Sequence, residues 1–245
     1  MNRRTQAAVL CGGRGERLRP LTDYFQKVMI PIGPKKLPLL AYILRLLTLN
    51  GVRDVVLLTG YRSEDIRRYF GDGTGHSSKL TYSEDQKDRK GSLNAVANAL
   101  KNGTISCDEL IVYYGDVLME LDIGGLLSAH RRTKADATLV LARGYTLPVG
   151  IAEVAPSGFV STFKEKPDLP LSVTVGCMVL GPMAMGLVKK MAGTKNTDLM
   201  THLVPKLLNG GKVASYYLDK AWYDVGSVAS FQKLDRELAL HPLGF

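Results

Sequence analysis

Cysteine, histidine and tryptophan are scarce in this chain, with three, four and one among its 245 residues. The cysteines, Cys11, Cys107 and Cys177, are odd in number and far apart, so no disulfide framework is expected. No cysteine or histidine spacing matches a zinc site, and no aromatic signature of an RNA-binding module is present. These absences exclude disulfide-stapled and zinc-stabilised small domains. They favour a reducing compartment, so we expect a cytoplasmic protein.

Long hydrophobic runs are absent as well. No stretch approaches the roughly 18 apolar residues that a membrane-spanning helix needs. The first apolar run, residues 7–10, is too short for the core of a signal peptide. No linker or low-complexity tract interrupts the chain, and 245 residues can bury one large core. We therefore expect one domain over residues 1–245 and no membrane partner.

The net charge is +9, from 32 Lys and Arg against 23 Asp and Glu. A basic balance of this size suits nucleic acid, an anionic surface or an anionic small substrate. The excess is dispersed in pairs such as Arg67-Arg68 and Lys189-Lys190, which is typical of the solvated faces of helices. We therefore expect no nucleic-acid partner, and charge alone does not choose among the remaining classes.

The first half of the chain alternates short apolar runs with helical patterns. Strands are predicted at Gln6–Cys11, Asp54–Thr59, Lys79–Tyr82, Glu109–Tyr114 and Ala137–Ala142, with helices at Leu39–Asn50, Ser63–Phe70, Ser92–Lys101 and Ile123–Thr133. The runs 55–58 and 110–114 are continuously apolar, which indicates strands covered on both faces, as in a parallel sheet. This half therefore predicts a Rossmann-like, doubly wound α/β fold with a mostly parallel sheet.

The pattern changes after about residue 141. Short strand-like runs at Gly150–Val154, Val160–Lys164 and Val173–Val179 are separated by turn residues, and the first two are typical of a hairpin. Helical patterns follow at Pro182–Met191, Leu199–Asn209 and Ser227–Leu240, with a strand at Val213–Leu218. We therefore expect a β-rich insertion in the second half of the same domain.

A glycine-rich loop follows the first predicted strand. Residues 10–22 read LCGGRGERLRPLT, in which three glycines are followed closely by Arg17 and Arg19. Glycines let backbone amides approach a ligand, and arginine binds phosphate oxygens through a planar fork of donors. Because the carboxyl ends of parallel strands are where such sheets bind ligands, this loop predicts a phosphate site. The alternative is an ordinary glycine turn with solvated arginines.

Two carboxylates stand in apolar surroundings. Asp116 directly follows the strand Glu109–Tyr114 and Gly115, and Asp224 lies in the sequence Trp-Tyr-Asp-Val-Gly. Magnesium prefers one or two carboxylates together with phosphate oxygens and water, so this pair is a candidate Mg²⁺ site beside the glycine loop. The alternative is that each aspartate caps a turn.

The loop resembles the L-x-G-G-x-G-T-R-L-x-P-L-T signature of the sugar-1-phosphate nucleotidyltransferases. Further matches follow in the order of that family along nearly the whole chain: Lys27 before an apolar-Pro run, Gly91-Ser92, Gly115-Asp116, Gly150, Glu165-Lys166-Pro167, Gly176 and residues 222–226. The runs around Asp116 and Asp224 look closest to the mannose-1-phosphate guanylyltransferase-like branch.

The resemblance implies Mg²⁺-dependent transfer of a nucleotidyl group from an NTP to a sugar 1-phosphate, with release of pyrophosphate. It implies that Arg17, Lys27 and Lys166 are catalytic and that Asp116 and Asp224 hold the metal. The implied nucleotide-binding residues are Leu10, Gly12, Gly13, Gln86 and Gly91. The implied sugar-phosphate residues are Gly150, Glu165, Lys166 and Gly176. A homo-oligomer is compatible with the pattern.

The sequence departs from the family pattern at several positions. Glu16 replaces the usual Thr, Gln26 replaces the usual Pro, and the segment after Gly91 is altered. These departures leave the substrates open: GTP with mannose 1-phosphate, or thymidylyl or uridylyl transfer to glucose 1-phosphate. They also motivate a catalytically silent sensor of nucleotides as an alternative.

Two further classes are not expected. A Rossmann oxidoreductase is disfavoured because Leu18 stands where the third glycine of a dinucleotide fingerprint belongs. Because the given sequence ends at Phe245, soon after the last predicted helix, we expect no C-terminal β-helix domain of the kind found in bifunctional family members.

Overall fold

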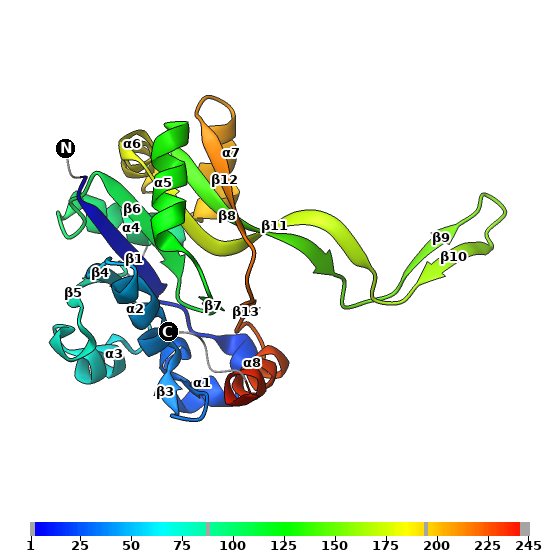
Figure 1. The fold of residues 1–245 in the computed structure, drawn as a ribbon, viewed down its shortest axis with the longest axis horizontal. Helices are drawn as coiled ribbons and strands as arrows, with labels where there is room; N and C mark the ends of the chain where they lie inside the picture. The colour runs from blue at the N-terminus through cyan, green and yellow to red at the C-terminus, as the bar shows by residue number, and fades with distance from the viewer. Residues whose placement is uncertain (1–2, 87–88, 194–195, 241–245) are drawn as a thin grey trace.

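The computed structural model describes residues 3–86, 89–193 and 196–240. Its centre is a seven-stranded sheet in the order β12-β8-β11-β6-β1-β4-β5 (Figure 1). The strands are β1 (Thr5–Cys11), β4 (Asp54–Thr59), β5 (Lys79–Glu84), β6 (Glu109–Tyr114), β8 (Ala137–Thr146), β11 (Asp168–Leu180) and β12 (Val213–Leu218). Only β11 runs against its neighbours, β6 and β8. The predicted α/β fold with a mostly parallel sheet is confirmed.

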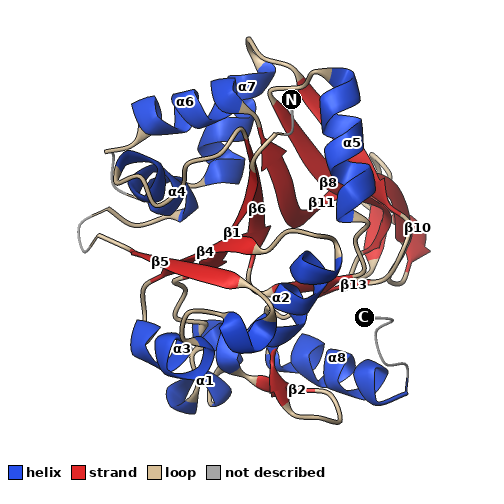
Figure 2. Ribbon diagram, turned by 60° about the vertical axis from the view of Figure 1, so that its left-hand side comes forward, coloured by secondary structure: helices blue, strands red, loops and turns tan. Residues whose placement is uncertain are grey.

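Helices cover both faces of this sheet (Figure 2). One face packs against α2 (Leu39–Leu49), α3 (Ser63–Phe70), α5 (Ile123–Thr133) and α8 (Val228–Leu240). The other face packs against α4 (Ser92–Lys101), α6 (Pro182–Met191) and α7 (Val204–Leu208). In β1, Ala7 and Val9 face the first layer and Ala8 faces the second, all fully buried. Burial on both faces explains the continuous apolar runs.

Short elements join the main strands and helices, and most of them lie beyond the carboxyl ends of the strands. They are η1 (Glu16–Leu18), α1 (Leu21–Tyr24), η2 (Lys27–Met29), η3 (Thr74–His76) and the strand pairs β2 (Pro31–Ile32) with β3 (Leu37–Pro38) and β7 (Val117–Met119) with β13 (Trp222–Asp224). None of these was predicted, because each is too short to show hydrophobic periodicity. The β7–β13 pair brings together segments about a hundred residues apart and determines where Asp224 lies.

The predicted helix Leu199–Asn209 is wrong as a single element. A π turn, η4 (Leu199–Leu203), comes first, and α7 begins only at Val204. Pro205 has no N–H to continue a regular helical ladder through this segment, which accounts for the irregular first turn. The Asp198 side chain instead accepts hydrogen bonds from the amides of Met200 and Thr201.

The predicted β-rich insertion is present and projects from the sheet. β8 and β11 are longer than predicted, and they carry a terminal hairpin of β9 (Ile151–Val154) and β10 (Val160–Lys164) away from the rest of the molecule (Figure 1). Every residue of β9 and β10 is exposed. Among the described residues, no helix is long and apolar enough to cross a bilayer.

A buried carboxylate joins the sheet to α5. The Glu109 side chain, at the start of β6, is fully buried and accepts hydrogen bonds from Arg131 at 2.6 to 3.1 Å and from Arg3 at 2.8 Å. Burial alone would raise the pKa of Glu109, but the hydrogen bonds from Arg131 and Arg3 outweigh it and lower this pKa. The folded protein therefore stabilises the charged carboxylate form of Glu109.

We expect Glu109→Ala to lower the free energy of unfolding by about 2 kcal/mol at pH 7, because it removes a buried partner of two guanidinium groups. The loss should shrink as pH falls below about 4, where the wild-type carboxylate is protonated in the unfolded chain and then in the folded protein. Urea unfolding at both pH values measures this. Glu84→Ala is the control: Glu84 pairs with Arg67 at 3.1 Å on the surface, so its loss should cost under about 1 kcal/mol. Equal losses would contradict the role of burial.

Candidate active site

A cavity of about 670 Å³ lies at the carboxyl ends of the parallel strands. Its walls come from the segments that follow β1, β4, β5 and β6, together with the start of α4. The chain reverses its order of winding between β1 and β6, and this is the point where open α/β sheets bind ligands. The lining residues include all five predicted nucleotide-binding residues, Leu10, Gly12, Gly13, Gln86 and Gly91, and also Lys27 and Asp116.

The glycine loop is held tightly against the neighbouring strand ends. A side chain at Gly12 would collide with the Asp85 carboxylate. The backbone carbonyl of Gly12 accepts a hydrogen bond from the Tyr61 amide at 3.2 Å. Leu18 is fully buried beneath the loop and anchors the turn η1. The loop therefore presents backbone to the cavity, as the glycine pattern predicts.

Gln26, a departure from the family pattern, fixes the segment that carries Lys27. Its side chain is 1% exposed, donates to the carbonyl of Cys11 and accepts from the amide of Val28 at 2.6 Å. The end of β1 is thus tied to the start of η2. Sequence reasoning missed this role because the two partners of Gln26 are backbone groups that only the fold brings together.

Lys27 reaches across the cavity floor to Asp116. Its ammonium lies 2.6 Å from a carboxylate oxygen of Asp116, and the Lys27 side chain is only 12% exposed. Arg17 and Lys27 also line a second cavity of about 410 Å³ beside the first, with Arg14, Glu16 and Gly226. Two predicted catalytic cations and one predicted metal ligand therefore lie side by side.

Asp224 joins this group through the β7–β13 pairing. The amide of Val225 donates to the carbonyl of Asp116 at 2.8 Å, which holds the two segments together. Burial and the charge of Asp116 raise the pKa of Asp224, while Lys27 and Arg17 lower it. Two carboxylates whose charges repel at close range fit a divalent cation that also takes phosphate oxygens and water.

The start of α4 closes another wall of the cavity. Gly91 has a φ of 104°, and a side chain there would overlap the backbone of Thr197, whose carbonyl carbon would lie 2.7 Å away. Ser92 donates to Asp198 at 2.5 Å and accepts from the amide of Leu199 at 2.9 Å. Gly91 therefore packs the helix start against the segment that precedes α7.

Asp85 is a cavity residue that sequence reasoning missed. It directly follows β5, and a side chain on either Gly12 or Gly60 would meet its carboxylate. Burial raises the pKa of Asp85 to about 6. No side-chain hydrogen bond or ion pair holds this carboxylate among the described residues. The sequence could have indicated Asp85, because this residue directly follows a predicted parallel strand and is next to Gln86.

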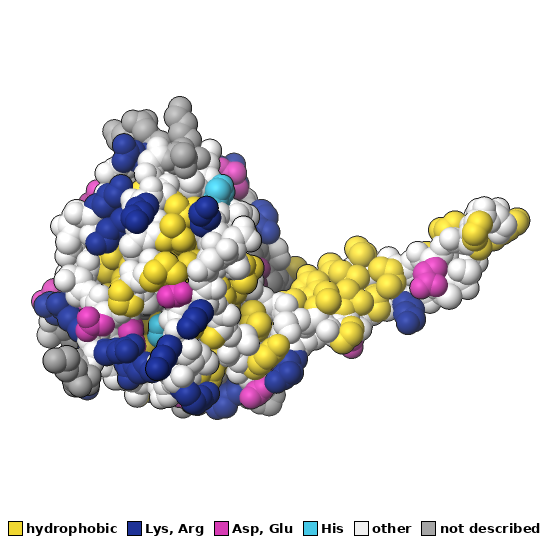
Figure 3. Space-filling view, turned by 90° about the horizontal axis from the view of Figure 1, so that it is seen from above, with side chains coloured by type: hydrophobic (Ala, Val, Ile, Leu, Met, Phe, Trp, Pro, Cys, Tyr) yellow, Lys and Arg dark blue, Asp and Glu magenta, His cyan; other side chains and the backbone are white. Residues whose placement is uncertain are grey.

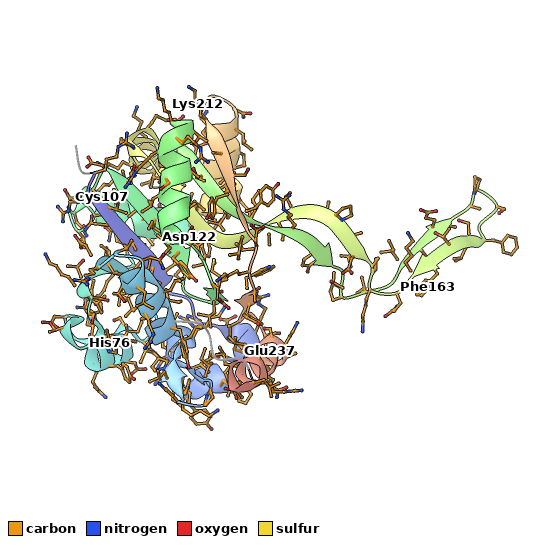
Figure 4. All side chains as sticks on the ribbon, in the orientation of Figure 1. His76, Cys107, Asp122, Phe163, Lys212 and Glu237 are labelled. Atoms are coloured by element: carbon orange, nitrogen blue, oxygen red, sulfur yellow. The ribbon has the colours of Figure 1, made fainter. Side chains whose placement is uncertain are left out.

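The predicted sugar-phosphate residues lie elsewhere. Gly150, Glu165 and Lys166 are in the projecting insertion next to β9 and β10, and Figure 4 shows Phe163 of this hairpin far from the sheet. Gly150 and Glu165 face each other, because a side chain on Gly150 would lie 2.7 Å from a Glu165 oxygen. Gly176 lies at the base of the insertion, against Val117. The roles of these four residues stay predictions.

We expect Asp85→Asn to raise the free energy of unfolding at pH 8 by about 1 to 2 kcal/mol. The pKa of Asp85 is higher in the folded protein, about 6, than in an unfolded chain. The folded protein therefore binds more protons between pH 4 and 6, and the wild type loses stability as pH rises through this range. The difference in free energy of unfolding between Asp85→Asn and the wild type should therefore grow as pH rises through the same range. Urea unfolding from pH 4 to 8 measures it, and a difference that is constant with pH would contradict this burial effect.

We expect Gly91→Ala to lower the free energy of unfolding by several kcal/mol. This loss should exceed the loss in Gly103→Ala by about 2 kcal/mol or more. Both glycines have positive φ, but a side chain at Gly103 meets nothing within 4 Å. The difference between the two variants therefore isolates the overlap with Thr197. Thermal unfolding of both variants measures it, and equal losses would contradict the close approach.

Comparisons with known proteins identify the family of this chain. The model of the Nucleotidyl transferase family matches residues 6–240. A mannose-1-phosphate guanylyltransferase of Mycobacterium tuberculosis is 31% identical over 95% of this chain and 64% of its own length. A UTP–glucose-1-phosphate uridylyltransferase of Synechocystis is 27% identical over 92% of this chain and 61% of its own length. The chain thus spans less than two thirds of the length of these curated relatives.

A solved structure shares the fold. A Bacillus anthracis protein in complex with sucrose superposes with a TM-score of 0.77 at 21% identity, covering 98% of this chain and 97% of that one. The resemblance seen in the glycine loop is therefore confirmed at the level of the family. Because the family model matches residues 6–240, the chain belongs to the Nucleotidyl transferase family.

Proposed function

We propose that this chain transfers a nucleotidyl group from an NTP to a sugar 1-phosphate. One observation carries the proposal: the glycine loop, the Lys27–Asp116 ion pair and Asp224 meet at the carboxyl end of one parallel sheet. Backbone amides, the two cations Lys27 and Arg17, and two carboxylates able to hold a divalent cation together suit a polyphosphate. The names of the relatives, which include guanylyl and uridylyl transferases acting on sugar 1-phosphates, support the same class.

The chemistry needs positioning and charge neutralisation more than proton transfer. An anionic oxygen of the sugar phosphate forms a bond to the α-phosphorus, and the bond from that phosphorus to the β-phosphate oxygen breaks. Pyrophosphate leaves with the electron pair. Because the nucleophile is already anionic, no general base is required. Lys27 and Arg17 lie where they would balance the charge that develops on the phosphates.

Asp116 and Asp224 would hold Mg²⁺ in this scheme. A bound Mg²⁺ supplies Lewis-acid stabilisation of phosphate oxygens. Burial first and the charge of Asp116 second raise the pKa of Asp224, and a bound cation would relieve the repulsion between the two carboxylates. Lys27 already compensates one oxygen of Asp116, which leaves the other oxygen for a metal.

GTP is the nucleotide that the cavity supports best, with mannose 1-phosphate as acceptor. Asp85 offers an unpartnered carboxylate beside Gly12 and Gln86. Guanine presents two adjacent N–H donors on its pairing edge, whereas thymine and uracil present one donor between two acceptors. A carboxylate can accept hydrogen bonds from both N–H groups of guanine, whereas it is repelled by the carbonyl oxygens of thymine and uracil. The first relative named above, a guanylyltransferase, agrees with this choice.

The test is a matrix of each NTP against a panel of sugar 1-phosphates, with pyrophosphate release as the readout. We expect turnover with GTP and mannose 1-phosphate, and a loss of preference for GTP over UTP of at least about tenfold in Asp85→Asn. Preference for UTP or dTTP in the wild type would overturn the choice of base. Tight nucleotide binding by calorimetry without turnover for any pair would favour the sensor alternative and reject the enzyme.

We expect Asp116→Asn and Asp224→Asn each to lower turnover by at least about a hundredfold, because each removes charge from the site that holds the metal and phosphates. Chelation with EDTA should abolish wild-type turnover, and added Mg²⁺ should restore it. Asp219→Asn, an exposed carboxylate away from the cavity, is the control and should keep the wild-type rate. Thermal unfolding checks that the variants fold. Wild-type rates in either site variant would reject the metal assignment.

A further inference from the structure

The projecting insertion is the most unusual surface of the molecule, and we call residues 143–175 the arm. The pairing of β8 with β12 ends at Ala142, and the pairing of β11 with β6 ends at Cys177. Beyond these points β8 and β11 pair only with each other, as far as Thr146 and Asp168, and the β9–β10 hairpin follows. Figure 1 shows the arm extending away from the sheet and its helices, which we call the head.

The arm exposes an unusual amount of apolar surface. Eight large apolar side chains are 40 to 77% exposed: Tyr145, Val149, Ile151, Val154, Phe159, Val160, Phe163 and Leu171. Figure 3 shows hydrophobic side chains gathered along the arm and at its tip. Together they leave on the order of 800 Å² of apolar area in water, which is about the area that one partner buries in a standard protein interface. An isolated two-stranded hairpin is marginally stable in water, so this surface needs a cover.

The head of the same chain does not provide that cover. Among the described residues, every hydrogen bond of residues 147–168 stays within the arm, including Leu147 to Pro167 and Ala155 to Phe159. This span has five charged residues that make no ion pair within the described part of the chain: Glu153, Lys164, Glu165, Lys166 and Asp168. The arm therefore presents both apolar and charged groups to something outside its own head.

The base of the arm fixes its direction. The Arg143 guanidinium lies 3.9 Å from the centre of the Tyr217 ring, and the Ser172 hydroxyl lies 2.9 Å from the Tyr217 hydroxyl. Tyr217 belongs to β12, so both strands of the arm are braced from the edge of the central sheet. This bracing holds the arm outward and opposes its folding back over its own cavity.

One exposed aromatic ring, Tyr61, borders the cavity, and two more, Tyr24 and Phe25, are exposed just before Gln26 in the chain. Tyr24, Phe25 and Tyr61 are 73, 41 and 37% exposed, and Tyr61 lines the cavity beneath the Arg14 guanidinium. Arg14 of the glycine loop lies over the Tyr61 ring, with its guanidinium 5.5 Å from the ring centre. The rim thus offers aromatic contacts for an apolar arm and positive charge for its carboxylates.

We propose that two copies of this chain exchange arms, so that each arm lies across the cavity mouth of the other copy. The ten residues from Asp168 to Cys177 in extended conformation span about 30 Å, close to the diameter of a small domain, so the reach is sufficient. In this pair Glu165 and Lys166 of one copy complete the sugar-phosphate side of the other copy's site. That second part rests on the proposed function, whereas the exchange itself rests only on the exposed surface.

Oligomeric state is the first test, and it does not depend on activity. Light scattering of the full chain should give the mass of a dimer, and the double variant Phe159→Ser/Phe163→Ser should shift it to a monomer. Leu49→Ser/Leu208→Ser is the matched control, because these head residues are 61 and 63% exposed and lie outside the arm. The control should remain a dimer. A monomeric wild type would overturn the exchange of arms. A Phe159→Ser/Phe163→Ser variant that is still a dimer would overturn it as well.

A mixed dimer is the second test, and it distinguishes sharing from closure within one chain. Asp116→Asn inactivates the head and Lys166→Ala inactivates the arm, so each homodimer should be nearly inactive. Co-expression with two tags isolates the dimer that holds one copy of each. With exchanged arms, the intact head meets the intact arm once, and the mixed dimer should recover about half of the wild-type turnover. If each arm served its own head, both sites would be defective and the mixed dimer would stay inactive.

The remaining outcomes are also decisive. Full activity of the Lys166→Ala homodimer would overturn the sharing of the sugar-phosphate site. The wild type could be a dimer, with Phe159→Ser/Phe163→Ser a monomer, while the wild type turns over no substrate pair. That result would reject the proposed function and leave the exchange of arms supported.

Discussion

The structure depends on β1 being paired on both edges by strands that run in its own direction. Its partners are β4 and β6, in registers that place Ala7 opposite Val55 and Ile111. Because all three strands end at the same edge, the segments that follow them must meet there. The glycine loop, Tyr61 and Asp116 are consequently neighbours in space, although they are far apart in the chain. The cavity follows from the direction of the strands.

The contacts around this edge hold the site in one arrangement. Gln26 ties the end of β1 to the segment of Lys27, and Lys27 is paired in turn with Asp116. The pairing of β13 with β7 then brings Asp224 to the same place. Each contact joins a residue near the cavity to backbone or charge on another segment. A site built in this way is organised before a ligand arrives, so little rearrangement is needed on binding.

The head and the arm differ in how they are stabilised. In the head, two apolar layers on either side of the sheet supply the buried area. In the arm, the strands pair through their backbones with irregularities in register, and the side chains of β9 and β10 are exposed. Backbone hydrogen bonds alone contribute little net stability in water, so the arm needs an apolar contact that the head does not give it. This contrast makes the arm the part of the molecule most suited to a second chain.

The sequence alone determined the order and type of the main elements, because continuous apolar runs and helical periods record burial directly. It also identified the glycine loop, Lys27, Asp116 and Asp224 through residue type and resemblance. Only the tertiary structure decided that Asp85 presses against Gly12, that Gln26 bridges two segments, and that Glu165 and Lys166 lie on a projecting arm. The physical reason is that these positions depend on contacts between distant segments, and a local pattern carries no record of which distant segment will be its neighbour.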